Sequence, residues 1–404
     1  MINKISFKNY KLFKEEQTLE LRPITILIGK NNSGKSAVLK LPTLIAGSLS
    51  AEFDEALQLD YLGVSLGTEY RDLVYNREIK FTDFLELDLS TKIDENSSKE
   101  IKIKIKLSDK PKEKPEIYDW EYFENDKLIQ KKEETDLFKG ITKIGFPMKN
   151  LNLNIDYIGA FREVPKVNYS YDSKDFENIG LKGENAYSIL IQDKEDKREL
   201  LNNISEWYKE NFENWMLDVK DFATPSGTQY QVVLSNEKLK DINIVYTGQG
   251  INQVLPLIVR SYMQDDEPVL ITIEEPETHL HPAAHGSLAQ RFVESYIYNN
   301  NKNYFIETHS ENFILRIQRM IADPEVNLTR EDVRIYYVNY EEDNFCSSVK
   351  EIVINEDGEI DDWPDNIFNE SYDELVKLKQ AQKKRIENVS LKSVMIFFLI
   401  QIMI

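Results

Sequence analysis

One stretch, residues 24–36 with the sequence ITILIGKNNSGKS, constrains the fold of this chain more than any other. Its first part, Ile24–Ile28, is apolar and largely β-branched, which is typical of a buried central strand. The remainder matches the spacing G-x-x-x-x-G-K-[ST] at Gly29, Gly34, Lys35 and Ser36. Glycines permit the tight turn of such a loop, and successive backbone N–H groups then face a chain of phosphates.

The last two residues of the motif supply the rest of the chemistry of a phosphate site. Lys35 places a positive charge near the β and γ phosphates, and the hydroxyl of Ser36 is a ligand for Mg²⁺. The apolar run after Ser36 predicts a helix whose positive N-terminal end faces the same anion, and Pro42 should kink or shorten that helix. We therefore expect the chain to bind ATP and Mg²⁺, with the nucleotide held by Gly29, Lys30, Asn31, Asn32, Ser33, Gly34, Lys35 and Ser36.

A pair of carboxylates follows a second predicted buried strand, Val269–Ile273. Glu274 and Glu275 stand directly after this strand. P-loop enzymes hold Mg²⁺ and activate water with acidic residues at the end of such a strand. We expect Glu274 to bind Mg²⁺ together with Ser36, and Glu275 to act as the base toward the attacking water.

Two further segments could contact a phosphate, one at the end of a predicted strand and one at the start of a predicted helix. The strand predicted over Asn303–Glu307 is followed by His309, which can reach the γ phosphate, and by Ser310, a typical helix N-cap. Gly248 and Gly250 precede a predicted helix and offer backbone N–H groups to an anion, although glycines before a helix are common. Three neighbouring histidines lack the spacing of the H-E-x-x-H zinc motif: His279, His281 and His285.

The composition limits the class of protein. A hydrophobic fraction of 41% with 11% aromatic residues is enough for a sizeable core, so a disordered chain is excluded. The net charge of −20 argues against a uniformly basic nucleic-acid binder but permits a local basic groove. The single cysteine, Cys346, and the lack of an apolar secretory segment at the N-terminus suit the cytoplasm. The apolar run 391–404 is too short for a comfortable membrane span, so no membrane partner is expected; a buried segment and a segment that docks on a partner are the open alternatives.

The chain changes character between its motifs. Residues 79–160 alternate or cluster as strands, with spacers rich in lysine and glutamate. One of these strands, 101–107, has an apolar side and a basic side; we interpret the lysines as a solvated edge, with a nucleic-acid contact as the alternative. Residues 175–222 have helical spacings without sustained heptads, so no long coiled coil is predicted. After residue 274 helices and strands alternate, as in a parallel sheet covered by helices.

In their order along the chain, the segments GKNNSGKS, GQGINQVLP, ITIEEPETHLHP and FIETHS resemble the motifs of the ABC-type ATPases of the RecF, SMC and OLD group. The chain is most similar to prokaryotic AAA ATPases with a short C-terminal domain of unknown function. The resemblance implies an α/β P-loop NTPase fold of the ABC-ATPase type, with a mainly parallel core sheet flanked by helices. It places the ATPase head at residues 1–340, with a β-rich lobe at about 79–160 and a helical insertion at about 175–222, and a small C-terminal module and tail at 341–404.

The resemblance also implies roles for particular residues. In this group the nucleotide is sandwiched between two heads, so we expect a homodimer or a higher even oligomer. The signature loop, which contacts the ATP held by the other subunit, corresponds to Gly248, Gln249, Gly250 and Asn252. Residues Glu277–Leu280 are similar to the D-loop and His309 to the switch histidine. Arg162 is similar to an arginine that contacts phosphate or the partner subunit; an ordinary surface arginine is the alternative.

Three functions are compatible with these features. The first is an ATPase that dimerises on ATP and controls a separate effector protein, as in prokaryotic anti-phage defence. The second is a RecF-like DNA-repair ATPase that itself binds nucleic acid. The third is an OLD-type nuclease, which is disfavoured because residues 341–404 show no glutamate-plus-DxD constellation on a sheet. The net charge of −20 favours the first function over the second.

Overall fold

The computed structural model describes residues 1–79, 83–94, 97–108, 113–146, 148, 151–360, 363, 364, 367, 368 and 373–385. The chain divides into two compact units, Met1–Asp361 and Asp362–Ile404. In the second unit, residues 373–385 are helical and the rings of Trp363 and Phe368 meet edge to face at 5.7 Å. The apolar run 391–404 lies outside the described residues. Within the described part of the chain, no helix is both long and apolar enough to cross a membrane.

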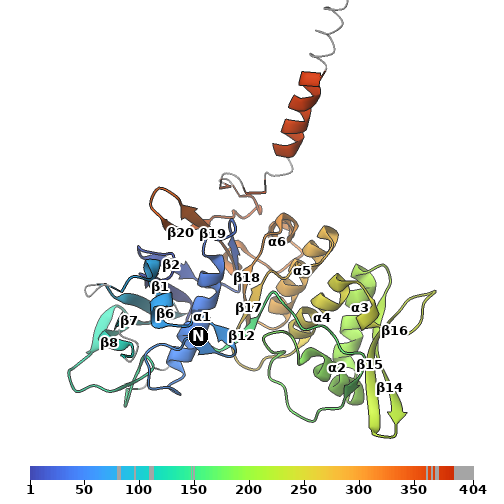
Figure 1. Cartoon of the computed structure of the whole chain (residues 1–404), viewed down its shortest axis with the longest axis horizontal. Coiled ribbons are helices and arrows are strands. Elements are labelled where there is room, and N and C mark those ends of the chain that lie inside the picture. The colour runs from blue at the N-terminus through green and yellow to red at the C-terminus, as the bar shows by residue number, and fades with distance from the viewer. Residues whose placement is uncertain are drawn as a thin grey trace, which may run out of the picture. The chain divides into compact units, whose positions relative to one another are not determined.

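A six-stranded sheet forms the centre of the first unit (Figure 1). Its strands occur in the order β12 (Ile155–Ile158), β17 (Val269–Glu274), β18 (Lys302–Glu307), β3 (Ile24–Ile28), β19 (Val333–Glu341) and β20 (Cys346–Ile352). The first five strands are parallel and β20 is antiparallel to β19, which confirms the mainly parallel core sheet. Because β3 and β17 both neighbour β18, the carboxyl ends of the three motif-bearing strands meet at one edge.

Helices cover both faces of this sheet. On β18, Phe305 belongs to the same apolar cluster as Leu41 of α1 (Lys35–Leu49), whereas the ring of Tyr304 stacks at 5.0 Å on Phe292 of α5 (Pro282–Tyr298). Successive residues of a strand face opposite sides of a sheet, so α1 and α5 lie on opposite faces. The expected shortening of the first helix is not observed, because α1 continues through Pro42 to Leu49.

A second, antiparallel sheet packs over α1 through the same apolar cluster. Its strands occur in the order β2 (Gln17–Glu20), β1 (Lys4–Lys8), β6 (Leu85–Asp94), β7 (Ser97–Lys106), β8 (Glu116–Glu124) and β9 (Lys127–Lys131). The isoleucines of β7 are buried in this cluster, and its lysines alternate with them on the outer face. Figure 1 shows this sheet in blue to teal at one side of the core sheet.

A third lobe follows β12 and combines two helices with a small sheet. Its elements are β13 (Tyr169–Ser170), α2 (Ala186–Glu195), α3 (Glu199–Asn211), β14 (Met216–Thr224), β15 (Gly227–Ser235) and β16 (Ile242–Asn243). The helical stretch predicted to residue 222 was too long, because its last residues form strand β14, which pairs with β15. Leu217 and Val219 lie on the buried side of this strand. The chain then returns to the core through α4 (Gln249–Tyr262), and α6 (Glu311–Ala322) follows β18.

Short elements complete the first unit. They are β4 (Asp60–Tyr61), β5 (Val64–Ser65), β10 (Phe138–Lys139), β11 (Thr142–Lys143) and the 3-10 turns η1 (Tyr70–Leu73), η2 (Tyr75–Arg77), η3 (Ile244–Tyr246) and η4 (Arg330–Asp332). Strand β20 lies beyond residue 340 and still belongs to the core sheet. The turn that follows packs on α6, where the side-chain amide of Gln318 donates to the carbonyl of Gly358 at 2.7 Å.

Candidate active site

The loop between β3 and α1 has the geometry of a phosphate cradle. Gly29 has φ 150° and Gly34 has φ 102°, conformations that favour glycine. A side chain at Gly29 would also place its Cβ 2.3 Å from the carbonyl oxygen of Val338, so glycine is required there for packing as well. The Nζ of Lys35 donates to the carbonyl of Lys30 at 2.8 Å across the loop. The predicted strand–loop–helix arrangement is thus present.

Glu307 is an important site residue that the sequence analysis did not single out. It ends β18, is buried, and accepts a hydrogen bond from Ser36 Oγ at 3.0 Å, while Lys35 Nζ lies 3.8 Å from its Oε1. Burial raises the pKa of this carboxyl to about 7, although Lys35 and Ser36 oppose the shift. The sequence did contain a signal for this residue: Glu307 is a carboxylate at the end of a predicted buried strand, two residues before His309.

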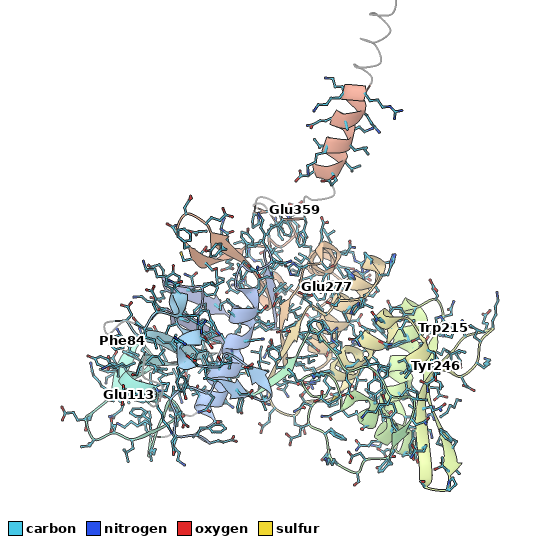
Figure 2. All side chains as sticks on the ribbon, in the orientation of Figure 1. Phe84, Glu113, Trp215, Tyr246, Glu277 and Glu359 are labelled. Carbon is cyan, nitrogen blue, oxygen red and sulfur yellow. The ribbon has the colours of Figure 1, made fainter. Side chains whose placement is uncertain are left out.

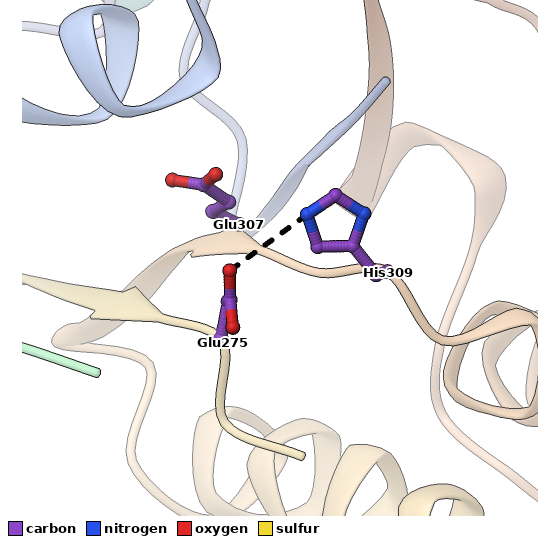
Figure 3. A group of neighbouring side chains, drawn as sticks. All are labelled: Glu275, Glu307 and His309. Carbon is purple, nitrogen blue, oxygen red and sulfur yellow. Dashed lines mark ion pairs between the residues drawn. The ribbon is translucent and has the colours of Figure 1, made fainter. Parts of the chain in front are cut away.

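Glu275 and His309 face each other beside Glu307 (Figure 3). His309 Nε2 lies 3.8 Å from Glu275 Oε1, and one ligand atom from each of the three side chains lies within 4.8 Å of the others. Burial and the charge of Lys35 lower the pKa of His309, so the imidazole is neutral at neutral pH. Glu275 itself has φ 40°, and its backbone N–H donates to the carbonyl of Glu307 at 2.9 Å.

These residues line one cavity of about 650 Å³, a size that suits a nucleotide. The lining residues are Leu12, Asn31, Asn32, Gly34, Lys35, Ser36, Ala37, Glu275, Glu307 and His309. The structure therefore brings together the predicted P-loop, the predicted base and the predicted histidine. Hydroxyl and carboxylate oxygens from Ser36, Glu307 and Glu275 are hard ligands, so this donor set fits Mg²⁺.

Glu274 is not placed with Ser36. Its carboxylate accepts hydrogen bonds from the Tyr157 hydroxyl and, at 3.1 Å, from the backbone N–H of Ala160, and Lys40 Nζ lies 3.7 Å away. The physical reason is the strand order. Glu274 ends β17 and turns toward the neighbouring β12, whereas Ser36 meets the carboxylate at the end of β18. The position of Glu274 next to Glu275 in the sequence did not reveal that the Glu274 side chain turns toward β12.

Arg162 is buried rather than at the surface, and it does not line the cavity. Its Nη2 donates to the carbonyl of Glu274 at 3.1 Å and to that of Glu275 at 3.2 Å. Burial lowers the pKa of the guanidinium to about 10, so it remains charged at neutral pH. In the monomer, Arg162 thus contacts the backbone of the paired carboxylates instead of a phosphate position.

The predicted signature loop lies at the start of α4. Gly248 is the N-cap, Gln249 is exposed and Asn252 is buried, and none of these residues lines the cavity of the same chain. Gly250 packs so closely on the D-loop segment that a Cβ would lie 2.5 Å from the carbonyl oxygen of His279. Glycine at this position lets the helix start approach the segment that leaves β17.

The remaining histidines have structural contacts. His281 caps α5 by accepting from the backbone N–H of Ala283 at 3.2 Å, and His285 Nδ1 is 2.7 Å from Ser310 Oγ. Ser310 caps α6, as predicted. Across the ranges that the structure describes, the one group of metal-ligating side chains contains His309 and none of the three neighbouring histidines.

The fold and the site define a P-loop ATPase. The model of the AAA ATPase domain family matches residues 1–189 and 170–314, and the chain belongs to this family. It is accordingly a nucleotide-binding enzyme that hydrolyses ATP. A second match, to a protein family of unknown function (DUF3696), covers residues 328–378.

Individual relatives agree with this assignment. The chain is 22% identical over 358 residues to an ATP/GTP phosphatase of Helicobacter pylori, covering 80% of this chain and 90% of that protein. Among solved structures, an SMC head bound to the C-terminal winged-helix domain of ScpA matches 87% of this chain and 98% of its own, with a TM-score of 0.50 and 13% identity. This structural likeness shows a common fold.

Proposed function

We propose that the chain binds ATP and Mg²⁺ in the P-loop cavity and hydrolyses ATP with Glu275 as general base. In this proposal, two heads close over ATP, and the closed dimer controls a separate effector protein in prokaryotic anti-phage defence. The observation that carries the proposal is the convergence of Lys35, Ser36, Glu275, Glu307 and His309 on one cavity, while the signature loop stays outside it.

Each side chain of the cavity has a distinct proposed task. Lys35, which now donates to a backbone carbonyl, would transfer its N–H groups to the β and γ phosphates. Ser36 and Glu307 would hold Mg²⁺, whose charge, when it is bound, neutralises the phosphates, and Glu275 would take the proton of the attacking water. The carboxylate of Glu275 is also held by Thr278, whose hydroxyl donates to Oε2 at 3.1 Å, which leaves Oε1 toward His309. Neutral His309 would donate to the γ phosphate.

A second copy of the chain would complete the site. The backbone N–H groups at the start of α4 have no intrahelical partners, so Gly248, Gln249 and Gly250 can receive a phosphate of ATP bound to the other head, with Asn252 in the same turn. Two large aromatic side chains are exposed beside the segments to which the resemblance assigns a contact with the other head. Tyr246, two residues before Gly248, is 72% exposed, and Phe161, next to Arg162, is 87% exposed. Their burial between two heads would favour the closed dimer.

A protein partner is favoured over nucleic acid by the charge distribution. On β7, Lys102 and Lys104 have acidic partners, Glu100 and Glu86, so the basic side of the strand is neutralised in place. The SMC head of the same fold is itself bound to a winged-helix domain, and an effector on this chain would be an arrangement of that kind. The net charge of −20 points the same way.

The deciding experiment compares Glu275→Gln with Glu274→Gln. Glu275→Gln retains the shape and hydrogen-bonding reach of the base but cannot accept a proton, so turnover should fall by about 10²–10⁴-fold while ATP still binds. The variant should accumulate as an ATP-bound dimer in sedimentation with ATP and Mg²⁺. Glu274→Gln, which loses its ion pair with Lys40 of α1, should loosen the contact between α1 and the end of β17 and reduce turnover less. Near-normal turnover in Glu275→Gln would remove the assignment of the base. Lost turnover without any ATP-dependent association would remove the two-head site.

A further inference from the structure

Two buried side chains of opposite charge contact the backbone of the proposed catalytic residues from outside the cavity. Arg162 is 5% exposed and Glu277 is 9% exposed, and neither lines the cavity that Glu275 and His309 enter. Figure 2 labels Glu277 among the core elements. Burying a charged side chain costs free energy unless hydrogen bonds and an opposite charge compensate, so the contacts of both residues need an explanation.

Arg162 fixes the peptide groups on both sides of Glu275. The carbonyls of Glu274 and Glu275 flank the Glu275 Cα, and one guanidinium nitrogen donates to both of them, at 3.1 and 3.2 Å. Glu275 has φ 40°, a conformation that side-chain-bearing residues rarely adopt and that surrounding contacts must hold. Charge-assisted bonds to both carbonyls hold the two peptide planes, and therefore the direction in which the Glu275 side chain leaves the backbone.

Glu277 does the same for His309. Its Oε1 accepts from the backbone N–H of His309 at 2.6 Å and from the Thr308 hydroxyl at 2.8 Å. Its Oε2 is buried and has no hydrogen-bond partner among the described residues. The segment that carries His309 is thus attached to the segment that leaves β17, three residues after Glu274.

The carboxylate of Glu277 also supports the charge of Arg162. Burial lowers the pKa of Arg162, and Glu277 is the carboxylate that opposes this shift most strongly, ahead of Glu274 and Glu275. The backbone of Arg162 is held in turn by α4, because the side-chain amide of Gln253 donates to its carbonyl at 3.3 Å. Arg162 thus connects α4 with the end of β17, and Glu277 connects the segment that leaves β17 with the segment after β18.

We propose that Arg162 and Glu277 are a positioning pair: Arg162 sets the direction of Glu275, Glu277 sets the place of His309, and together they bring the base and the histidine to one point of the cavity. The inference rests on the roles proposed above for Glu275 and His309. Neither member of the pair lines the cavity, so we expect them to affect the rate of the chemical step and not nucleotide affinity.

The test uses the full chain and two substitutions at each position. Arg162→Met should lower kcat by about 10- to 100-fold, the usual cost of losing a residue that orients a reacting group. The affinity for a fluorescent ATP analogue should stay within about threefold, because the cavity lining is intact. Arg162→Lys should recover part of kcat, since one ammonium can reach a carbonyl but lacks the planar fork. Glu277→Gln, which keeps an acceptor for the His309 N–H, should retain more activity than Glu277→Leu.

Arg291→Met is the matched control. Arg291 is also buried, and its Nε, like that of Arg162, has no hydrogen-bond partner among the described residues. Its guanidinium stacks on Tyr262 at 4.1 Å from the ring centre, away from the cavity. Its substitution should affect thermal stability without changing kcat per folded molecule. The positioning pair is overturned by wild-type kcat in Arg162→Met or Glu277→Leu, or by an equal loss of kcat in Arg291→Met. It is also overturned if ATP affinity falls in step with kcat.

Two further results keep the interpretation unambiguous. If thermal melting shows that Arg162→Met does not fold, the comparison of Arg162→Lys and Glu277→Leu with wild type decides the matter, with wild-type kcat in both rejecting the pair. Near-normal turnover in Glu275→Gln would instead reject the proposed base itself, whatever the variants of Arg162 and Glu277 show.

Discussion

Lysine–glutamate pairs occur in two very different parts of this molecule. At the P-loop edge of the parallel sheet, Lys35 Nζ lies 3.8 Å from Glu307, and the two side chains are 4% and 5% exposed. On the outer face of the antiparallel sheet, Lys104 Nζ lies 3.3 Å from Glu86, and the side chains are 44% and 29% exposed. The shorter pair is the more exposed one, so distance alone does not rank their importance.

Burial separates the two pairs. At the P-loop edge it raises the pKa of Glu307 to about 7 and lowers the pKa of Lys35, which shows that each charge is held there against its preference for water. A solvated pair gains little, because water screens the attraction and two long side chains lose freedom. The comparison teaches that burial, not distance, distinguishes the pair in the proposed nucleotide site from the pairs that keep the sheet surface solvated.

The largest expected effect is that of Lys35→Ala. Turnover should fall to background, because Lys35 is the only lysine or arginine among the described residues that line the cavity. The fold should persist, since the main role of Lys35 is toward the phosphates. Equilibrium binding of ATP, steady-state turnover and circular dichroism check this prediction. A folded variant with unchanged affinity and turnover would contradict the whole P-loop assignment.

An intermediate effect is expected for Glu307→Gln, which should reduce Mg²⁺-dependent turnover by about 10- to 100-fold through the loss of a ligand that also orients Ser36. Mg²⁺-dependent ATP affinity of the wild type should rise with pH toward and above 7, as this carboxyl becomes ionised. Titrations of ATP with and without Mg²⁺ at several pH values measure both quantities. If the Mg²⁺-dependent ATP affinity does not change with pH, Glu307 does not take part in binding Mg²⁺.

The raised pKa of Glu307 also predicts how the free energy of unfolding changes with pH. Its pKa is raised from 4.5 to about 7 on folding, so the folded protein binds the proton more tightly than the unfolded chain does. The contribution to the free energy of unfolding is therefore fully present below pH 4.5 and is lost as pH rises through about 7. In urea unfolding without nucleotide, the advantage of wild type over Glu307→Gln should shrink from pH 5 to pH 8; parallel curves would refute the shift.

The smallest effect is expected for Lys104→Ala on the outer face of β7. The free energy of unfolding should change by less than about 1 kcal/mol, and ATP turnover should stay at the wild-type level. A double-mutant cycle with Glu86→Ala in low and high salt measures the coupling between the two side chains. A coupling free energy well above about 1 kcal/mol for Lys104 and Glu86 would contradict the contrast between the exposed pair and the buried pair.

Much of the core could be predicted from sequence because its signals are local. The buried strands Ile24–Ile28, Val269–Glu274 and Lys302–Glu307 each follow the pattern of their own residues, and the Ser310 cap and Pro282 helix start depend on neighbours in the chain. The end of the helical insertion was missed because residues 216–222 become a strand only by pairing with β15.

The amino-acid sequence by itself determined that this chain forms a P-loop, that carboxylates follow a buried strand, and that His309 follows another, because backbone conformation and phosphate chemistry reside in contiguous residues. Only the tertiary structure decided which carboxylate meets Ser36. Strand order places β18 beside β3, so Glu307 reaches the P-loop serine while Glu274 turns to Tyr157. It likewise decided that Arg162 is buried against the backbone of Glu275, since that contact joins residues more than a hundred positions apart, and no local pattern encodes it.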